Sequence, residues 1–258
     1  MIFLKTLKEI KIIKEGCDIL SKVHGMIAKE IRPGVKTIFL NNIADNFIRD
    51  FKAVPSFKGY RGFPFSICTS VNEYIVHGFP SDYVLKEGDI ISIDCGVYYK
   101  GFHSDSAFTY PVGKVDKSII NLLEVTKNSL YLGIDSINSK SNIGNIGYFI
   151  QNYIESFGYS IVKDLVGHGI GKNLHEKPEV PNYGKKNSGL KLCPGMVIAI
   201  EPMVNFGTSK VFYEKNGWFV RTSDKKPSAH FEHTVAILDN KVEILTTYKY
   251  IENFFKYD

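Results

Sequence analysis

Residues 85–94 read L-K-E-G-D-I-I-S-I-D, and residues 192–201 read L-C-P-G-M-V-I-A-I-E. Leucine, glycine, isoleucine and a final acid recur at identical spacing in the two stretches, which are offset by 107 residues. In each, a glycine, Gly88 or Gly195, marks a turn before a run of apolar, mostly β-branched residues. Each run closes on a single carboxylate, Asp94 or Glu201. The pattern predicts the same turn and strand twice, with an acid at the equivalent place.

The sequence upstream of each strand repeats as well. The i, i+3, i+4, i+7 spacing of an amphipathic helix occurs at Leu40, Ile43, Ala44, Phe47 and Phe51, and again at Ile143, Ile146, Gly147, Ile150 and Ile154. The offset is 103 residues, close to that of the strands. We interpret this as an internal duplication, with halves at roughly 1–115 and 116–245 in a single domain, 1–258. The alternative is that two helix-then-strand stretches are alike by pattern alone.

The remaining pattern predicts helices and antiparallel hairpins. An amphipathic helix is expected to run from the first residues toward Glu30. Apolar or alternating runs predict strands at 89–99, 102–110, 197–204, 233–238 and 242–245. Turns are expected at Lys100-Gly101 and at Asp239-Asn240. This order of elements is typical of an α+β fold and not of regular βαβ winding.

Composition excludes several classes of protein. Among 258 residues, 44% are hydrophobic and 23% charged, which rules out a collagen-like, coiled-coil or wholly disordered chain. The net charge is +5, and the lysines are scattered, whereas nucleic-acid binding usually needs a clustered basic stripe. We therefore expect no specific nucleic-acid partner, and a weak electrostatic affinity for the ribosome stays open.

The same composition points to the cytoplasm. No stretch approaches the roughly 18 apolar residues of a membrane helix, and charged residues interrupt the apolar N-terminal run, unlike a signal peptide. The four cysteines lie far apart, without C-x-x-C spacing. They indicate neither a disulfide framework nor a zinc knuckle.

Four acids are candidates for a metal site. Asp94 and Asp105 lie on the two arms of the hairpin that turns at Lys100-Gly101, so their carboxylates are expected side by side. If the duplication holds, Glu201 and Glu232 correspond to them in the second half. Four carboxylates gathered in an apolar interior need cations to neutralise them, which favours divalent metal. The alternative is that each acid is a separate surface or hydrogen-bonded residue.

A glycine-rich stretch, G-H-G-I-G-K-N-L-H-E at 167–176, supplies candidate histidines. His168 interrupts the glycines, so the stretch does not match a nucleotide-binding loop, and we expect this histidine to be a metal ligand. His175 is a candidate for a ligand or for acid–base work, and His77, at the end of another strand pattern, is a weaker one. Four carboxylates balance two divalent ions in charge. Oxygen-rich ligands with one imidazole suit Mn, Fe(II), Co or Zn.

These motifs resemble a known family. N-E-Y-I-V-H-G (72–78), I-D-C-G-V (93–97), F-H-S-D-S-A (102–107), the glycine-rich stretch, I-E-P-M-V (200–204) and F-E-H-T-V (231–235) are similar to the signature of type I methionine aminopeptidases. The resemblance runs from about residue 6 to residue 248. It implies the pita-bread fold, in which two pseudo-symmetric halves with a central antiparallel sheet and flanking helices surround a dinuclear metal site.

The resemblance also implies roles for residues. The metal ligands would be Asp94, Asp105, His168, Glu201 and Glu232. His77 and His175 would face the substrate. His175 would form a hydrogen bond with the attacked carbonyl, and Glu201 would relay the proton of the attacking water. A methionine pocket would comprise Phe57, Tyr60, Phe63, Cys68, Leu174 and Trp218. The alternative for these aromatic residues is ordinary core packing. The chain departs from the family's pattern at His230, where Gln is usual, and at Leu174, where Phe is common.

The expected reaction is hydrolytic removal of the N-terminal methionine from nascent polypeptides, with a small second residue preferred. The expected setting is a cytoplasmic monomer acting at the ribosome. Only 25 residues lie between His175 and Glu201, whereas type II enzymes carry a long insertion there. Two alternatives are an Xaa-Pro dipeptidase, which shares the metal site, and a non-catalytic pita-bread binding protein, which would typically lack metal ligands.

Overall fold

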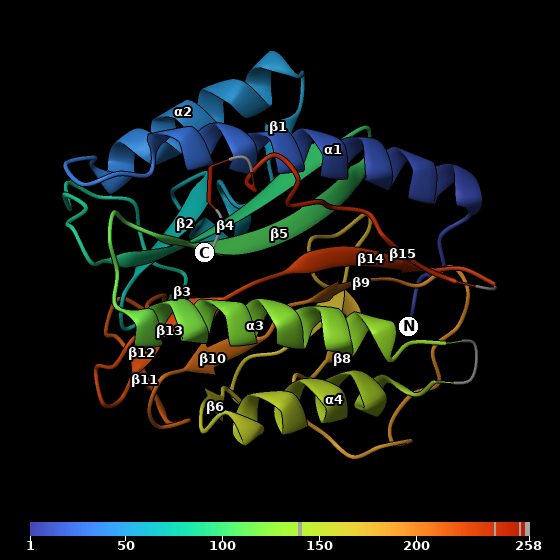
Figure 1. The fold of residues 1–258 in the computed structure, drawn as a ribbon. Helices are drawn as coiled ribbons and strands as arrows, with labels where there is room; N and C mark the ends of the chain where they lie inside the picture. Colours follow the sequence, from blue (N-terminus) through green and yellow to red (C-terminus); the bar gives the residue numbers. More distant parts are fainter. Residues whose placement is uncertain (139–140, 240, 253, 256–258) are drawn as a thin grey trace.

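The computed structural model describes residues 1–138, 141–239, 241–252 and 254–255. Figure 1 shows two groups of helices, α1 and α2 above the strands β4, β5, β9 and β14, and α3 and α4 below them. In the part of the chain that is described, no helix is both long and apolar enough to cross a membrane. A pair of helices followed by a series of strands occurs twice along the chain, as the sequence predicts.

The first helices pack onto the hairpin that carries two of the acids. Helix α1 (Leu7–Glu30) begins with a capping box between Thr6 and Glu9, and buries Leu20 and Val23. Helix α2 (Thr37–Asp50) packs beside it. Beneath them, β1 (Val54–Pro55) and β2 (Ile67–Val71) flank β4 (Ile90–Tyr99), which also pairs with β5 (Phe102–Pro111). The short helix η1 (Tyr60–Gly62) lies in the loop between β1 and β2.

The predicted hairpin is confirmed, with one refinement of its register. Lys100 and Gly101 form the turn with positive φ angles of 47° and 90°. Gly96 lies opposite Asp105, and Asp94 lies opposite Ala107. The two aspartates are therefore diagonal neighbours on one face of the hairpin, which still keeps their side chains within reach of each other.

The second group of helices covers the remaining strands. Helices α3 (Lys117–Asp135) and α4 (Ile143–Ser156) lie side by side (Figure 1). A five-stranded sheet has the order β15 (Val242–Ile244), β14 (His233–Ile237), β9 (Val197–Ile200), β7 (Gly167–Gly169) and β8 (Glu176–Val180). One smaller sheet has the order β13 (Ser228–His230), β10 (Met203–Asn205) and β6 (Ser160–Ile161), and the other β11 (Val211–Tyr213), β12 (Val220–Thr222) and β3 (Tyr74–Val76).

The prediction of one continuous strand at 197–204 is wrong. The chain leaves the five-stranded sheet after β9, passes Glu201-Pro202 and enters a different sheet as β10. Pro202 has no N–H to donate to a ladder, so the pairing ends there. A second break, at Phe231-Glu232, separates β13 from β14. Both breaks leave a predicted ligand, Glu201 or Glu232, outside the strand ladders.

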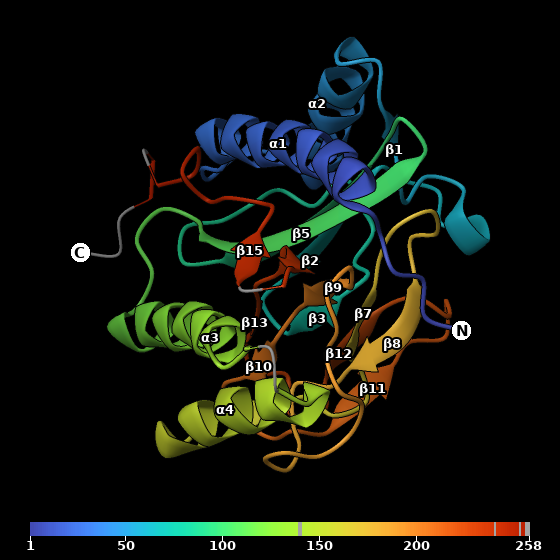
Figure 2. The ribbon, with the colours of Figure 1, turned by 90° about the vertical axis from the view of Figure 1, so that its right-hand side faces the viewer.

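The two groups of elements share one apolar core. A single buried cluster includes Leu20 of α1, Ile93 of β4, Ile150 of α4 and Ile198 of β9. Strands β14 and β15 pair as predicted, but Asn240 of the predicted turn lies outside the described residues. In Figure 2 the N-terminus lies beside β8, where Ile2 forms a parallel bridge with Lys177.

Candidate active site

One cavity of about 280 Å³ brings the predicted site residues together. It is lined by Phe57, Tyr60, Arg61, Phe63, Cys68, His77, Asp94, Asp105, His168, Leu174, His175, Glu201, Trp218 and Glu232. Every residue that the sequence placed at the site lines this cavity. Arg61 is the one lining residue that the sequence analysis missed. Its charge within a loop of aromatic residues was the signal that the sequence offered, whereas its left-handed backbone, with a φ of 48°, is seen only in the structure.

The acids and His168 converge on one end of the cavity. Ligand atoms of Asp105, His168 and Glu232 all lie within 4.8 Å of one another. His168 Nε2 is 3.5 Å from Glu201 Oε1 and 3.8 Å from Asp105 Oδ2. Asp94 lines the same end from β4. The structure thus gathers four carboxylates and one imidazole from both halves of the sequence.

Hydrogen bonds from two side-chain hydroxyls to the backbone of the acids fix this end of the cavity. The Thr234 hydroxyl donates to the Asp105 carbonyl at 2.7 Å and accepts from the Asp105 N–H at 3.1 Å. The Tyr248 hydroxyl donates to the Glu232 carbonyl at 2.8 Å and accepts from the Glu232 N–H at 3.0 Å. Each acid is therefore held through its own backbone; Asp105 lies on β5, and Glu232 immediately precedes β14.

One ring nitrogen of His168 forms a hydrogen bond with the backbone, and the other faces the acids. Its Nδ1 lies 2.9 Å from the carbonyl of Gly169, so Nδ1 carries the proton and donates. Nε2 is then unprotonated and faces Asp105 and Glu201. A hydrogen bond from the ring nitrogen that does not bind the metal is the usual way in which proteins set the tautomer of a metal-binding histidine.

The electrostatics of the cluster require cations. Burial raises the pKa of Asp94 and of Glu201 to about 7, and it raises those of Asp105 and Glu232 well above their ordinary values. Repulsion between neighbouring carboxylates raises the pKa of Asp105 and Glu232 further. Asp94 Oδ1 and Glu232 Oε1 are buried and have no hydrogen-bond partner among the residues that the structure describes. Buried carboxylate oxygens without a hydrogen-bond partner are suitable ligands for divalent metal ions.

The two remaining histidines line the cavity beside this cluster. His77 follows β3 with a φ of 61°, and burial lowers its pKa to about 4. His175 lies at the exposed side, with its ring centroid 4.3 Å from that of His168 and its Nδ1 2.7 Å from the hydroxyl of Tyr60. With the Tyr60 hydroxyl donating to Nδ1, Nε2 of His175 carries the ring proton. Partial desolvation, and next the neighbouring His168, lower the pKa of His175, which keeps the ring neutral.

The other end of the cavity is an apolar recess. Phe63 packs edge-on against Trp218 at 5.1 Å and against Phe57 at 6.4 Å between ring centroids. Leu174 and Cys68 are buried in the same cluster. These residues both line the cavity and pack against one another. The recess suits an unbranched apolar side chain.

The two positions that depart from the family's pattern lie at different places. Leu174 forms part of the cavity wall. His230 is buried behind Glu201, with its Nε2 3.7 Å from Glu201 Oε2. Neither ring nitrogen of His230 has a hydrogen-bond partner among the described residues.

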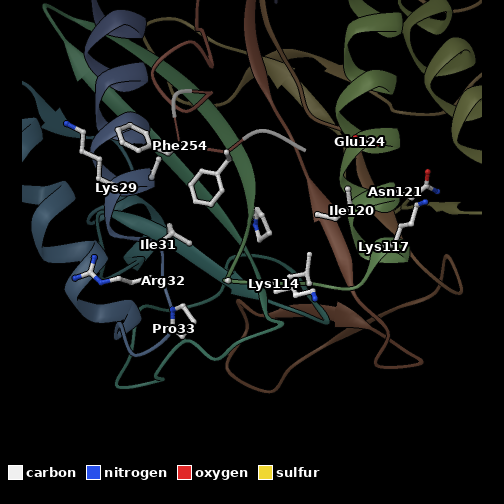
Figure 3. A pocket seen from close by; sticks show the side chains of 15 residues that line it. Lys29, Ile31, Arg32, Pro33, Lys114, Lys117, Ile120, Asn121, Glu124 and Phe254 are labelled. Atoms are coloured by element: carbon white, nitrogen blue, oxygen red, sulfur yellow. The ribbon is translucent and has the colours of Figure 1, made fainter. Parts of the chain in front are cut away.

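A larger cavity, of about 1020 Å³, lies elsewhere, between the end of α1 and the start of α3. Figure 3 shows its lining residues, and the charged ends of Lys29 and Arg32 point away from the cavity. Glu124 is the one acid among its lining residues, which include no histidine. This cavity does not have the groups that hydrolysis needs.

An α+β fold of this kind, with a buried carboxylate–imidazole cluster at its centre, defines a metal-dependent hydrolase. The model of metallopeptidase family M24 matches residues 11–239, and the chain belongs to this family. The methionine aminopeptidase of Clostridium acetobutylicum is 49% identical over 95% of this chain and 99% of its own length. The crystal structure of the methionine aminopeptidase from Rickettsia prowazekii has a TM-score of 0.94 at 39% identity and covers 96% of this chain and 100% of its own.

The chain is also similar in fold to a more distant relative. The prolidase of Pyrococcus horikoshii has a TM-score of 0.77 at 25% identity, and the match covers 95% of this chain and 63% of the prolidase. These similarities confirm the pita-bread α+β fold. The protein is an enzyme, a metallopeptidase that uses divalent metal ions.

Proposed function

We propose that the protein removes the N-terminal methionine from nascent polypeptides by hydrolysing their first peptide bond. The observation that carries this proposal is the single cavity of about 280 Å³ that joins a carboxylate–imidazole cluster to an aromatic recess. The full-length similarity to proteins named methionine aminopeptidase supports the same activity.

In this proposal two divalent ions are held by Asp94, Asp105, His168, Glu201 and Glu232. When bound, the ions activate water and polarise the peptide carbonyl. Four carboxylates and two divalent ions balance in charge, which accounts for the clustering of acids in a buried place. The donor set suits Mn, Fe(II), Co or Zn.

The remaining roles belong to side chains that line the cavity. The methionine side chain occupies the recess formed by Phe57, Phe63 and Trp218. Nε2–H of His175 donates to the oxygen of the attacked carbonyl, where negative charge develops. Glu201 accepts the proton of the attacking water and passes it to the leaving amine. His77 orients the scissile amide from the opposite wall.

The setting of the reaction follows from the substrate. Nascent N-termini emerge at the ribosome in the cytoplasm, and we place the protein there as a monomer. The family resemblance implies a small second residue in the substrate, and we expect the same preference here.

The experiment that tests the proposal compares two peptides with the metal-loaded protein. Met-Ala-Ser should release free methionine, and Ala-Pro-Ala should stay intact. An Xaa-Pro dipeptidase would show a preference for Pro in the second position without a need for methionine. A non-catalytic binding protein would cleave neither peptide with any of the four metals.

Loss of the Trp218 side chain should weaken substrate binding. Because Trp218 packs on Phe63 at one wall of the recess, Trp218→Ala should raise the KM for Met-Ala-Ser by about 10-fold, in line with the roughly 1–3 kcal/mol that apolar pocket contacts contribute. Metal content should stay the same. Phe219→Ala is the matched control, because Phe219 packs on Phe79 and Tyr74 but does not line the cavity. Equal effects of the two substitutions on KM would contradict the assignment.

A further inference from the structure

A buried ion pair connects the N-terminal segment to the loop that carries His175. Lys5 Nζ lies 2.6 Å from Glu176 Oε2, and the two side chains are only 5% and 2% exposed. Most surface ion pairs contribute little to stability, whereas removal of one partner of a buried pair leaves an uncompensated charge. The proposed catalytic groups do not include either residue.

The contacts around this pair fix the loop from several sides. The other oxygen of Glu176, Oε1, accepts a hydrogen bond from the N–H of Asn173 at 3.0 Å. Lys5 Nζ also donates to the carbonyl of Phe3 at 2.9 Å, and the Lys5 N–H donates to the carbonyl of Gly195 at 2.7 Å. The backbone of Lys5 is thus anchored to the segment that leads into β9, and its ammonium group holds the loop through Glu176.

Gly171 shows how closely Lys5 approaches the loop. A Cβ at position 171 would collide with Cε of Lys5, so the lysine stem passes directly against this glycine. The carbonyl of Gly171 accepts a hydrogen bond from the N–H of His103 at 2.7 Å. Residues 171–176 are therefore held between the hairpin on one side and Lys5 on the other.

His175 depends on this loop for its orientation. Glu176 is the first residue of β8, and it faces the buried Lys5, whereas its neighbour His175 lines the catalytic cavity. His175 is exposed, and among the described residues its ring shares a hydrogen bond with the Tyr60 hydroxyl through Nδ1. Besides its contacts with the rings of Tyr60 and His168, the ring takes its position from the backbone at 175–176.

We propose that Lys5 is a positioning residue for the reaction: its ion pair with Glu176 fixes residues 171–176 and through them the ring of His175. This inference rests on the proposed function, because it gives Lys5 an effect on turnover through His175. It predicts that removal of the Lys5 charge impairs the chemical step more than the binding of substrate or metal.

The first test is Lys5→Met, which keeps the length of the side chain and removes its charge. We expect kcat for Met-Ala-Ser to fall by about 10-fold, because small displacements of a catalytic group lower rates by up to about 100-fold. KM and metal content should remain those of the wild type. Lys5→Arg, which keeps the charge, should restore most of the kcat.

The matched control is Lys14→Met. Lys14 also lies near the N-terminus and pairs with an acid far along the chain, Glu243, but this pair is exposed and does not touch the loop. Lys14→Met should leave kcat unchanged. If Lys5→Met does not fold, Lys5→Met with Glu176→Gln removes both charges, and this double variant should fold while its kcat remains low.

The decisive readout combines Lys5→Met with His175→Ala. If Lys5 acts through His175, adding Lys5→Met to His175→Ala should cause no further loss of kcat. Unchanged kcat in Lys5→Met, or an independent further loss in the His175→Ala background, would overturn the inference. Absence of methionine release by the wild-type protein would instead contradict the proposed function, so the two failures are distinguishable.

Discussion

Asp105→Asn should abolish turnover and empty at least one metal position. Asp105 is 4% exposed, and its carboxylate lies in the group with His168 and Glu232 whose ligand atoms are within 4.8 Å of one another. An amide is neutral, and it is a weaker metal ligand than a carboxylate. Loss of an outer-shell partner typically lowers metal affinity or activity by about 10–100-fold, and loss of a direct ligand is expected to exceed that. Mass spectrometry of bound metal, beside a Met-Ala-Ser assay, measures both effects.

The metal-free form of this variant separates a ligand defect from a folding defect. In the absence of metal, Asp105 is a buried acid next to other acids, and burial raises its pKa well above the ordinary value. The neutral amide removes that repulsion, so the melting temperature of metal-free Asp105→Asn should equal or exceed that of the metal-free wild type.

Asp89→Asn is the matched control for this substitution. Asp89 is also buried, but its carboxylate accepts hydrogen bonds from Tyr83, Asn72 and the N–H of Lys86, away from the cavity. The Asp89→Asn variant should therefore have the metal content and the turnover of the wild type. Normal metal content in Asp105→Asn would contradict the ligand assignment.

His175→Ala should lower kcat by about 100- to 1000-fold while both metals stay bound. The proposed role of His175 is to donate to the carbonyl oxygen as charge develops, and loss of one such donor typically costs this much in rate. Since the interaction strengthens in the transition state, KM for Met-Ala-Ser should change little. Steady-state kinetics across a series of metal concentrations should show slow turnover at all of them.

His168→Ala is the natural comparison, because the two rings are neighbours and differ only in what they face. His168 directs Nε2 at Asp105 and Glu201, so its loss should weaken the binding of one ion, and excess metal should partly restore the rate. Titration calorimetry distinguishes the two variants. If His175→Ala lost an ion and His168→Ala kept both, the two assignments would be reversed.

The parts of the site that are local in sequence could be predicted, because hairpin geometry is set over short distances. The Lys100-Gly101 turn and the ten-residue arms on either side place Asp94 and Asp105 on one face. The repeated pattern then indicated Glu201 and Glu232 as their partners, and all four acids line one cavity.

The parts that depend on contacts between distant segments could not be predicted. The continuous run at 197–204 has the apolar character of one strand, but β9 pairs with β14 whereas β10 pairs with β13 and β6. The exchange of partners at Pro202 is set by the tertiary fold. The Lys5–Glu176 pair joins residues 171 positions apart, and no local pattern marks it. Arg61 reaches the cavity through a left-handed backbone conformation that neither periodicity nor composition indicates.

The most direct test of the account is the release of methionine from Met-Ala-Ser by the chelator-treated protein as divalent metal is added back. The account predicts no release without metal, because activation of the attacking water depends on the bound ions. It predicts release that rises with added Mn, Fe(II), Co or Zn and reaches a maximum near two ions per chain. Full methionine release in the presence of excess chelator would contradict it.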